Sequence, residues 1–535
     1  MTSTRRFPPL PTPINSENLD KLLQGYPDRE YISKGFKVGF SLNFAGDPTT
    51  LTCRNSITAL NHPNIVEDKL KTELTLGRIS GPYKTPPFEI FKCSPLSLRE
   101  KKDSGKYRLL HNLSFPYDCN SVNFNIPQHF KSVEYQTIDD CIDIILRLDS
   151  PFLSKTDIKD AFRLLPLRPE DYYLTGMHWN GLYYFDKCLP MGCASSCQIF
   201  ERFSDSIQWI MEHKYNIISV KVLDDFLFIS PILVSAQNHL NTFFEVSDAI
   251  QLPLADFKTV SPTTTLTFLG IEIDSTDRTL RIPDEKLYKY LHELELLINS
   301  NDLSLRDLRS IIGKLQHCCT IIKSGRAFLR RLYNLTMGKN NPNHILKISD
   351  SVRADLLIWR NFLLTLNKKV FMNNNAFVSA DDLNMHTDAS SYGYGATYGS
   401  HWFQGQWPND WQSLNITILE MYPIYMLIGT FKEKLANSKV QIFCDNEAVV
   451  YIINKLTSKN NTVMSIVRPL TLMLLKNNIT LIAEHIPGKN NLLCDFLSRQ
   501  VVRSSGILPH HMRRQPELVP WQVLPGNFAL DSKAS

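Results

Sequence analysis

The fold of this chain is decided by one short stretch, IISVKVLDDFLFI at residues 217–229. Two runs rich in β-branched and aromatic residues flank Leu223-Asp224-Asp225, a pattern typical of two strands joined by a turn. Adjacent carboxylates that are buried or half-buried repel each other, so something must neutralise them, and a divalent metal ion does this well. Mg²⁺ suits such a site because it prefers oxygen ligands and leaves positions open for substrate phosphates. Taken alone, the pair is better explained as a solvated turn, because turns favour aspartate.

Further carboxylates and a small-residue loop lie upstream. In FLSKTDIKDAF, residues 152–162, a short apolar run ends at Asp157. A carboxylate at a strand end beside the Asp224–Asp225 hairpin would complete a clamp for two metal ions, which activates an attacking hydroxyl and stabilises a leaving pyrophosphate. Between them, LPMGCASSCQ at residues 189–198 runs into a predicted helix. Its small residues would let the backbone approach a base pair closely.

In this order the motifs, which fall within residues 66–285, resemble the reverse transcriptase family. The resemblance rests on Asp157, on the Leu-Pro-x-Gly loop at 189–192, on Val222-Leu223-Asp224-Asp225 and on Phe268-Leu269-Gly270-Ile271, which resembles the primer-grip hairpin. It implies that Asp157, Asp224 and Asp225 hold two Mg²⁺ ions, or Mn²⁺ in their place. Two positions depart from the family: Val222 replaces a frequent aromatic residue, and Met191 replaces the glutamine usual in retroviral enzymes.

The same resemblance implies the residues that bind the incoming deoxynucleoside triphosphate. KKDSGKYR at residues 101–108 resembles the fingers hairpin of retroviral enzymes, in which a lysine and an arginine hold the triphosphate. Phe162 matches the steric gate that clashes with a ribose 2′-hydroxyl, and Lys258 resembles the lysine that assists pyrophosphate departure. Taken in isolation, Lys101 and Arg108 fit a solvated charged turn, and Phe162 fits an aromatic residue of the core. The implied substrate-binding set is Lys101, Arg108, Phe162, Met191, Gly192 and Lys258.

A second set of carboxylates follows nearer the C-terminus. Asp388 lies on a predicted strand before a glycine-rich hairpin, Glu420 on a predicted helix, Asp445 at the end of an apolar strand and Asp495 on an amphipathic helix. Each alone fits a surface acid, but together they could hold two Mg²⁺ ions about 4 Å apart for phosphodiester hydrolysis. This order resembles ribonuclease H. The resemblance implies that all four acids bind metal and that His485 assists product release or proton transfer; an ordinary loop histidine is the alternative.

The region between the two carboxylate sets is predicted to be helical. Leu305, Leu308, Ile312 and Leu315 fall on one face of a helix, and Ser304 is its candidate N-cap. A basic set follows at near-helical spacing, and we expect it to contact the phosphates of a duplex, although a solvated helix face is the alternative. This set comprises Lys323, Arg326, Arg330 and Arg331.

Length and composition bound these interpretations. A chain of 535 residues suggests three or four domains, and its 43% hydrophobic content excludes a mostly disordered protein. The net charge of +5 permits nucleic-acid binding, and no apolar run is long enough to span a membrane. The 11 cysteines include no Cys-x-x-Cys pair, which favours a reducing, intracellular compartment, cytoplasmic or nuclear. Cys188, Cys193 and Cys197 are interpreted as small loop residues.

The predicted fold class is an α+β and α/β multidomain protein, in which a right-hand polymerase of fingers, palm and thumb precedes a ribonuclease H-like α/β domain. The predicted domains are a partly ordered N-terminal extension (1–65), fingers and palm (66–285), a helical thumb and connection (286–380), the ribonuclease H-like domain (381–500) and a C-terminal tail (501–535).

The resemblance implies an RNA-directed DNA polymerase of a retrotransposon with ribonuclease H activity. Its partners would be an RNA template, a DNA primer, the RNA–DNA hybrid and deoxynucleoside triphosphates, with no membrane; the sequence leaves the oligomeric state open. HNLSFP at 111–116 and HIPGKN at 485–490, together with Leu497-Ser498-Arg499, look most like DIRS-like, tyrosine-recombinase elements. The alternatives are a catalytically inactive nucleic-acid-binding relic of a transposon and a nuclease specific for the hybrid.

Overall fold

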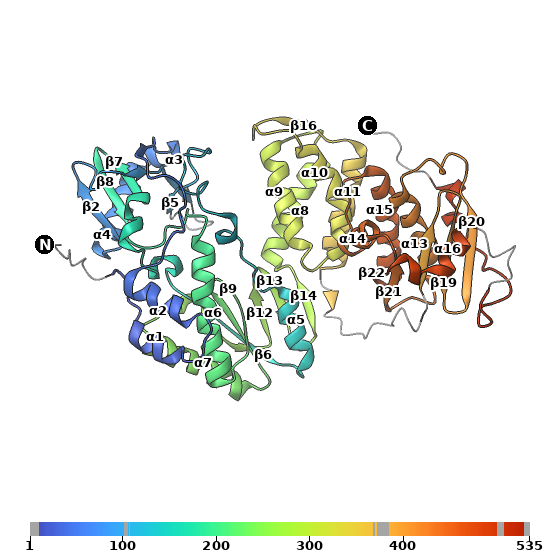
Figure 1. Ribbon diagram of the computed structural model, residues 1–535, viewed down its shortest axis with the longest axis horizontal. Coiled ribbons are helices and arrows are strands. Elements are labelled where there is room, and N and C mark those ends of the chain that lie inside the picture. Colours follow the sequence, from blue (N-terminus) through green and yellow to red (C-terminus); the bar gives the residue numbers. More distant parts are fainter. Residues whose placement is uncertain are drawn as a thin grey trace. The chain divides into compact units, whose positions relative to one another are not determined.

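The computed structural model describes residues 10–100, 105, 107–367, 370–371, 383, 385–499 and 508–528. The chain divides into two compact units (Figure 1). The first contains the residues up to Leu269 together with Ile273–Arg278, and the second contains Gly270–Glu272 and the residues from Thr279 onward. The first boundary falls in the turn between β12 (Thr265–Phe268) and β13 (Ile271–Asp274), where Leu269 and Gly270 both have positive φ. Two further boundaries follow, after Glu272 within β13 and after Arg278.

A four-stranded sheet in the order β11-β6-β10-β9 forms the centre of the first unit. Its strands are β6 (Phe152–Asp157), β9 (Ser219–Val222), β10 (Asp225–Ser230) and β11 (Val260–Thr263). The predicted hairpin at 217–229 is thus confirmed as β9 and β10, which pair antiparallel. Phe226 and Phe228 of β10 pack against Phe243 of α7 (Leu233–Ala249), with ring centroids 5.3 and 5.0 Å apart. The helix predicted after the small-residue loop is α6 (Ser196–Tyr215).

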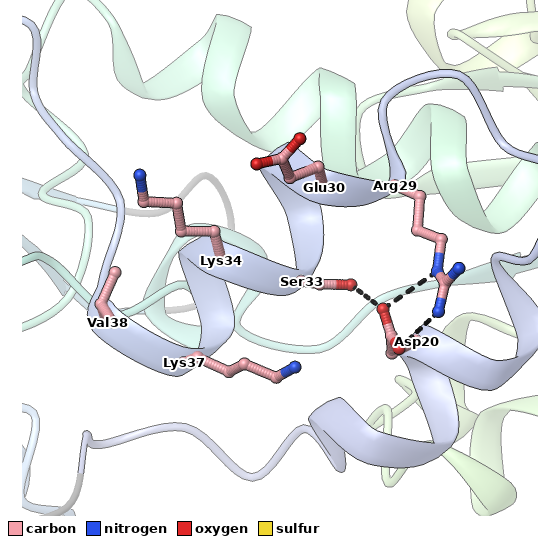
Figure 2. A pocket seen from close by; sticks show the side chains of 7 residues that line it. All are labelled: Asp20, Arg29, Glu30, Ser33, Lys34, Lys37 and Val38. Carbon is pink, nitrogen blue, oxygen red and sulfur yellow. Dashed lines mark hydrogen bonds and ion pairs between the residues drawn. The ribbon is translucent and has the colours of Figure 1, made fainter.

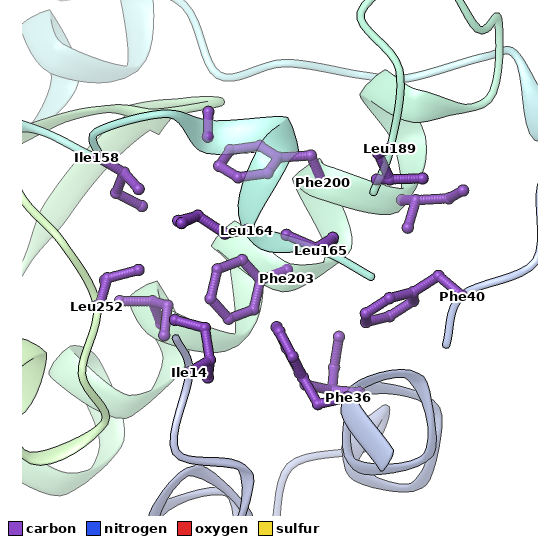
Figure 3. Close-up of a cluster of buried hydrophobic side chains, with 14 of the residues drawn as sticks. Ile14, Phe36, Phe40, Ile158, Leu164, Leu165, Leu189, Phe200, Phe203 and Leu252 are labelled. Carbon is purple, nitrogen blue, oxygen red and sulfur yellow. The ribbon is translucent and has the colours of Figure 1, made fainter. Parts of the chain in front are cut away.

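The described N-terminal residues, from residue 10 onward, complete this core. Ile14 and side chains of α1 (Ser16–Leu22) and α2 (Arg29–Val38) are buried with Phe200 and Phe203 of α6 (Figure 3). The pairs Leu19/Leu23 and Ile32/Phe36 are spaced four residues apart, so each pair lies on one helix face. Prolines and polar residues around these pairs obscured that periodicity in the sequence.

A five-stranded sheet in the order β1-β3-β7-β8-β2 and the hairpin β4-β5 lie in the same unit. Helices α3 and α4 pack against β4, β2 and β5, whereas α5 lies elsewhere in this unit (Figure 1). The bounds are β1 (Leu51–Thr52), α3 (Ile57–Leu60), α4 (Pro63–Thr75), β2 (Ile79–Tyr83), β3 (Lys92–Cys93), β4 (Leu96–Glu100), β5 (Tyr107–His111), α5 (Ile138–Arg147), β7 (Gly176–Trp179) and β8 (Leu182–Asp186).

The second unit begins with the helical region predicted from the sequence. Its helices are α8 (Asp284–Ile298), α9 (Leu305–Cys318), α10 (Arg330–Thr336) and α11 (Asp350–Thr365), and its short strand pairs are β14 (Thr279–Arg281) with β17 (Val370–Phe371) and β15 (Asp302–Ser304) with β16 (Ile345–Lys347). Helix α9 confirms the predicted apolar face, since all four predicted side chains are buried. The Ser304 hydroxyl caps it by accepting a 3.1 Å hydrogen bond from the Asp307 amide.

A five-stranded mixed sheet in the order β20-β19-β18-β21-β22 follows in the second unit. Strands β18 and β21 run parallel, as do β21 and β22, whereas β18, β19 and β20 are antiparallel. The bounds are β18 (His386–Ala389), β19 (Gly393–Tyr398), β20 (His401–Gln406), α13 (Ile416–Phe431), β21 (Lys439–Cys444), α14 (Glu447–Lys455), α15 (Asn461–Lys476), β22 (Thr480–His485) and α16 (Leu492–Ser498). No helix of the described residues is long and apolar enough to cross a membrane.

Residues 508–528 pack on this mixed sheet, so this part of the predicted tail belongs to the folded unit. The Arg513 and Glu517 amides donate hydrogen bonds to the carbonyls of Ser400 and Trp402. The Tyr422 hydroxyl of α13 donates a 3.1 Å hydrogen bond to the Val523 carbonyl. Two short 3-10 turns, Trp521–Val523 and Pro525–Asn527, lie in this segment, so its prolines do not prevent packing.

Candidate active sites

The first carboxylate set meets at one edge of the central sheet of the first unit. Asp157 ends β6 and Asp225 begins β10, and the two residues are direct partners across the antiparallel strands. Asp224 lies in the tight turn before β10, where Leu223 has φ 54°. The Ile158 amide donates a 2.9 Å hydrogen bond to the Asp224 carbonyl and fixes this turn against β6. The structure therefore brings together all three predicted carboxylates.

Burial and nearby negative charges oppose the ionisation of Asp224 and Asp225. Burial raises the pKa of Asp225 to about 6, and the neighbouring Asp157 and Asp224 add to the rise. Burial and Asp157 also raise the pKa of Asp224. Oδ1 of Asp225 is buried and accepts no hydrogen bond from the described residues. Oxygen ligands with an unsatisfied buried atom fit a hard divalent cation such as Mg²⁺.

Two lysines flank the three carboxylates. Lys258 donates a 2.6 Å hydrogen bond to Oδ2 of Asp157, so the predicted lysine does reach the site. Nζ of Lys155 lies 3.7 Å from Oδ1 of Asp225 and donates to the Thr267 carbonyl. Lys155 was not among the site residues predicted from the sequence. Its position two residues before Asp157 was the available signal, because alternate residues of a strand share a face.

The other predicted substrate-binding residues surround this edge only in part. Phe162 lies in a single 3-10 turn, Ala161–Leu164, and its half-buried ring packs edge-on against Phe200 at 5.3 Å. Arg108 is exposed on β5, and its charge opposes the rise in the pKa of Asp224. Lys101 lies outside the described residues.

The Leu-Pro-Met-Gly loop packs closely against β5. A Cβ atom on Gly192 would lie 1.7 Å from the His111 carbonyl oxygen, so only glycine fits there. Asn123 donates a 2.8 Å side-chain hydrogen bond to the Gly192 carbonyl. Met191 is 46% exposed, which leaves its side chain free to meet a ligand. Three cysteines, Cys188, Cys193 and Cys197, lie in or beside this loop, and none forms a disulfide. Cys188 and Cys193 are buried, as expected of small packing residues.

The second carboxylate set meets on the mixed sheet of the second unit. Asp388 lies on β18, Glu420 on α13, Asp445 directly after β21 and Asp495 on α16. Burial and the charges of Asp445 and Asp495 raise the pKa of Asp388 to about 7. Burial and the charges of Asp388 and Asp445 raise the pKa of Glu420 to about 9. Ligand atoms of Glu420, Cys444 and Asp445 lie within 4.8 Å of one another, and Oδ1 of Asp445 is buried without a hydrogen bond from the described residues.

Gly395 of β19 allows α16 to pack closely enough for Asp495 to lie near the other three carboxylates. A Cβ atom on Gly395 of β19 would lie 2.4 Å from Cβ of Leu497, so α16 packs directly on the strand. Asn491 donates a 2.9 Å hydrogen bond to the Thr387 carbonyl and holds the start of α16 beside β18. Arg499, which our sequence analysis did not select, forms a 2.7 Å ion pair with Asp495. His485 lies opposite Cys444 in register, and its charge opposes the rise in the pKa of Asp445.

The predicted basic set does not form one helical face. Lys323 and Arg326 lie in a 3-10 segment, Lys323–Phe328, whereas Arg330 and Arg331 begin α10. Arg331 donates a 2.9 Å hydrogen bond to Asp355, whose side chain is 1% exposed. Nε of Arg468 on α15 lies 3.7 Å from the same carboxylate oxygen. Arg331 thus neutralises a buried carboxylate, a role that sequence spacing could not reveal.

The first unit also contains a pocket between its two N-terminal helices (Figure 2). It has a volume of about 490 Å³ and is lined by residues of α1 and α2. Arg29 and Ser33 both donate hydrogen bonds to Asp20, which holds the pKa of Asp20 down at about 2. The pocket is also lined by Glu30, Lys34, Lys37 and Val38. None of these residues belongs to the predicted sites.

Residues 100–273, which include β6, β9 and β10 and all three carboxylates of the first set, match the model of the family described as reverse transcriptase (RNA-dependent DNA polymerase). This segment is a reverse transcriptase domain. Related domains occur in viral polyproteins: the chain is 22% identical over 372 residues to a polyprotein of Cassava vein mosaic virus, which covers 66% of this chain and 53% of the polyprotein. It is 26% identical over 239 residues to Protein P of Heron hepatitis B virus, covering 42% of this chain and 28% of that protein. The chain thus spans about half or less of these relatives.

Solved structures show the reverse transcriptase fold as well. A foamy viral protease–reverse transcriptase in complex with double-stranded DNA has a TM-score of 0.51 and 14% identity, covering 88% of this chain and 82% of that one. A foamy viral protease–reverse transcriptase in complex with an RNA/DNA hybrid has a TM-score of 0.51 and 13% identity, covering 95% and 65%. The predicted mixed α and β fold with a right-hand polymerase is confirmed. The ribonuclease H-like domain that was predicted to follow it stays a prediction.

Proposed function

We propose that this protein is an RNA-directed DNA polymerase, which extends a DNA primer on an RNA template. The observation that carries the proposal is the meeting of Asp157, Asp224 and Asp225 at one sheet edge, with Oδ1 of Asp225 buried and unsatisfied by the described residues. Mg²⁺ bound there would lower the barrier to attack by the primer 3′-hydroxyl and neutralise the phosphates; Mn²⁺ could substitute. Asp157, Asp224 and Asp225 would be its ligands.

The remaining residues of the site would orient the nucleotide. Arg108 supplies a guanidinium that suits bidentate contact with a triphosphate, and Lys101 a second positive charge. Phe162 would exclude a ribose 2′-hydroxyl. Lys258, which is 46% exposed while it holds Asp157, could turn toward the departing pyrophosphate. Gly192 and Met191 would border the templating base pair.

We further propose that the second carboxylate set is a ribonuclease H site that cuts the RNA strand of the hybrid. Its support is the arrangement of Asp388, Glu420, Asp445 and Asp495 about strands β18 and β21 of the mixed sheet, with the pKa of Asp388 and of Glu420 raised. Four oxygen ligands of this kind suit two Mg²⁺ ions. His485, beside Asp445, would transfer a proton or release product.

The proposed domains follow from these sites: fingers and palm over 66–285, a helical thumb and connection over 286–380 and a ribonuclease H-like domain over 381–500. The proposed partners are an RNA template, a DNA primer, their hybrid and deoxynucleoside triphosphates. The reverse transcriptase domain is of the type found in retroelement and viral polyproteins. A retrotransposon of the DIRS-like type is the finer proposal, supported by the HNLSFP and HIPGKN motifs.

The test is primer extension on an RNA template with Mg²⁺, with the primer and the RNA carrying separate labels. Asp224→Asn should reduce extension at least about a hundredfold and leave RNA cleavage intact, because it alters one carboxylate set only. Asp445→Asn should reduce RNA cleavage and leave primer extension intact. Asp248→Asn, which removes an exposed carboxylate of α7, is the matched control and should match the wild type. Hybrid binding without either activity would instead support an inactive relic, and cleavage without extension a hybrid-specific nuclease.

A further inference from the structure

We propose that Arg163 is a positioning residue that sets the sugar selectivity of the polymerase site by fixing Phe162 relative to the 189–192 loop and β5. This inference rests on the proposed polymerase function and on Phe162 as its gate. The family resemblance assigned no role to Arg163. The geometry of its guanidinium points to one.

The Arg163 guanidinium joins three separate parts of the first unit. Its Nε and Nη2 donate hydrogen bonds of 3.0 and 2.8 Å to Glu73 of α4. Nη2 also lies 2.7 Å from Oδ1 of Asp186 at the end of β8. Nη1 lies 3.3 and 3.5 Å from the carbonyl oxygens of Leu189 and Cys188, where the Leu-Pro-Met-Gly loop begins. The side chain is only 11% exposed, so solvent screens these charged contacts weakly.

Asp186 extends the connection to β5. Its Oδ2 lies 3.1 Å from Nδ1 of His111, and Nε2 of His111 lies 3.0 Å from the Gly176 carbonyl oxygen. His111 ends the strand that carries Arg108, and its own carbonyl packs against Gly192. A displacement of Arg163 would therefore reach both the candidate triphosphate ligand on β5 and the loop at 189–192.

The turn that carries Phe162 is held at both ends. Asp160, at φ 58°, accepts a 2.8 Å hydrogen bond from Arg78 at its side chain and a 2.7 Å hydrogen bond from the Arg163 amide at its carbonyl. After Arg163 the chain enters the core, where Leu164 and Leu165 are fully buried (Figure 3). The aromatic ring of Phe162 is thus attached to a turn whose position depends on the Arg163 ion pairs.

Sugar selectivity is sensitive to such a position because a steric gate works by contact. A displacement of about 1 Å in a positioned group can change a rate roughly a hundredfold. Lysine cannot replace Arg163, since a single ammonium group cannot reach Glu73, Asp186 and the Leu189 carbonyl in the fixed fork geometry of a guanidinium. Arg163→Lys keeps the buried positive charge, so it tests geometry with the least risk to folding.

The experiment compares kcat/KM for a deoxynucleotide and for the matching ribonucleotide in primer extension by the full chain. Arg163→Lys should reduce the preference for the deoxynucleotide roughly tenfold or more. Phe162→Ala should reduce it too, and Phe162→Ala with Arg163→Lys should reduce it no further than Phe162→Ala alone. The matched control is Arg168→Met, which removes an arginine 2.8 Å from the buried carboxylate of Asp171 without touching Phe162 or Leu189. Arg168→Met should keep wild-type selectivity even where its Tm falls as far as that of Arg163→Lys.

Each other outcome overturns the inference. If folded Arg163→Lys keeps wild-type selectivity, Arg163 does not position the gate. If its effect persists in full in the Phe162→Ala background, Arg163 acts on something other than the gate. If Phe162→Ala leaves selectivity unchanged, the gate itself is misassigned, although the polymerase function stands. If the wild type extends no primer, the proposed function fails and the inference fails with it.

Discussion

Lys258 donates a 2.6 Å hydrogen bond to Asp157, so a lysine already holds one of the three carboxylates proposed to bind Mg²⁺. A cation that binds Asp157 must compete with this ammonium group. The pair therefore links metal affinity to the position of a side chain that is 46% exposed and able to move.

Lys258→Met should separate metal affinity from rate. Extension should slow at least about tenfold because the charge available to the leaving pyrophosphate is lost. The Mg²⁺ concentration for half-maximal rate should fall, because Asp157 no longer pairs with an ammonium group. Titration of extension rate with Mg²⁺ measures both quantities. Lys159→Met, two residues after Asp157 and exposed, is the control; equal effects of the two variants would count against the competition.

Mg²⁺ binding to the second unit should release protons near neutral pH. In the metal-free protein the pKa is about 7 for Asp388 and about 9 for Glu420, so at pH 7 these groups hold more protons than they would with a cation between them. Calorimetric titration with Mg²⁺ in buffers of different ionisation enthalpy measures the release. Asp388→Asn with Glu420→Gln should abolish it. An equal release by this double variant would refute the assignment of these groups.

Gly395→Ala should impair RNA cleavage while primer extension persists. A Cβ atom there would lie 2.4 Å from Cβ of Leu497, so α16 must move and Asp495 must move with it. We expect a loss of stability of about 1–3 kcal/mol. Gly313→Ala on α9, where a Cβ atom meets nothing within 4 Å, is the control and should stabilise the protein by about 0.5–1 kcal/mol. Cleavage and urea denaturation of both variants test this; wild-type cleavage by Gly395→Ala would contradict it.

The basic residues of the helical region should differ in their effect on hybrid binding. Arg326→Gln should reduce the slope of log affinity against log salt by about one, if Arg326 meets a phosphate. Arg331→Gln should leave the slope unchanged and lower the free energy of unfolding by about 3 kcal/mol, because it withdraws a partner from buried Asp355. Binding measured across a salt series distinguishes them. A changed slope for Arg331→Gln would restore the prediction made from sequence.

Asp355 should make the stability of the second unit fall as pH rises. Its pKa in the folded chain is raised to about 6 by burial, despite Arg468 and Arg331, so the folded state holds this proton more tightly than the unfolded state does. Stability is therefore lost between about pH 4 and about pH 6, by up to about 3 kcal/mol. Urea denaturation at several pH values measures it. Asp355→Asn should lack this component; an identical pH dependence in both proteins would contradict the assignment.

Sequence patterns predicted the elements that carry chemistry better than the contacts between them. The hairpin of Asp224 and Asp225 and the capped helix after Ser304 were predictable because turn chemistry and apolar spacing are local. Arg331 was predicted to bind phosphate because its ion-pair partner, Asp355, lies 24 residues later and no local pattern links the two residues. The N-terminal helices were missed because short amphipathic segments between prolines show little periodicity. Lys155 and Arg163 depend on partners that only the fold brings near.

The packing of residues 508–528 on the mixed sheet has a consequence for how the chain avoids self-association. Strand β20 is the last strand of that sheet on one side, and the Arg513 and Glu517 amides occupy the carbonyls of Ser400 and Trp402 along it. An uncovered edge strand offers its backbone to the edge of another molecule. A chain shortened to residue 500 would therefore expose unpaired backbone carbonyls along β20 and tend to aggregate. In a chain that continues to residue 528, the carbonyls of Ser400 and Trp402 are already hydrogen-bonded within the molecule.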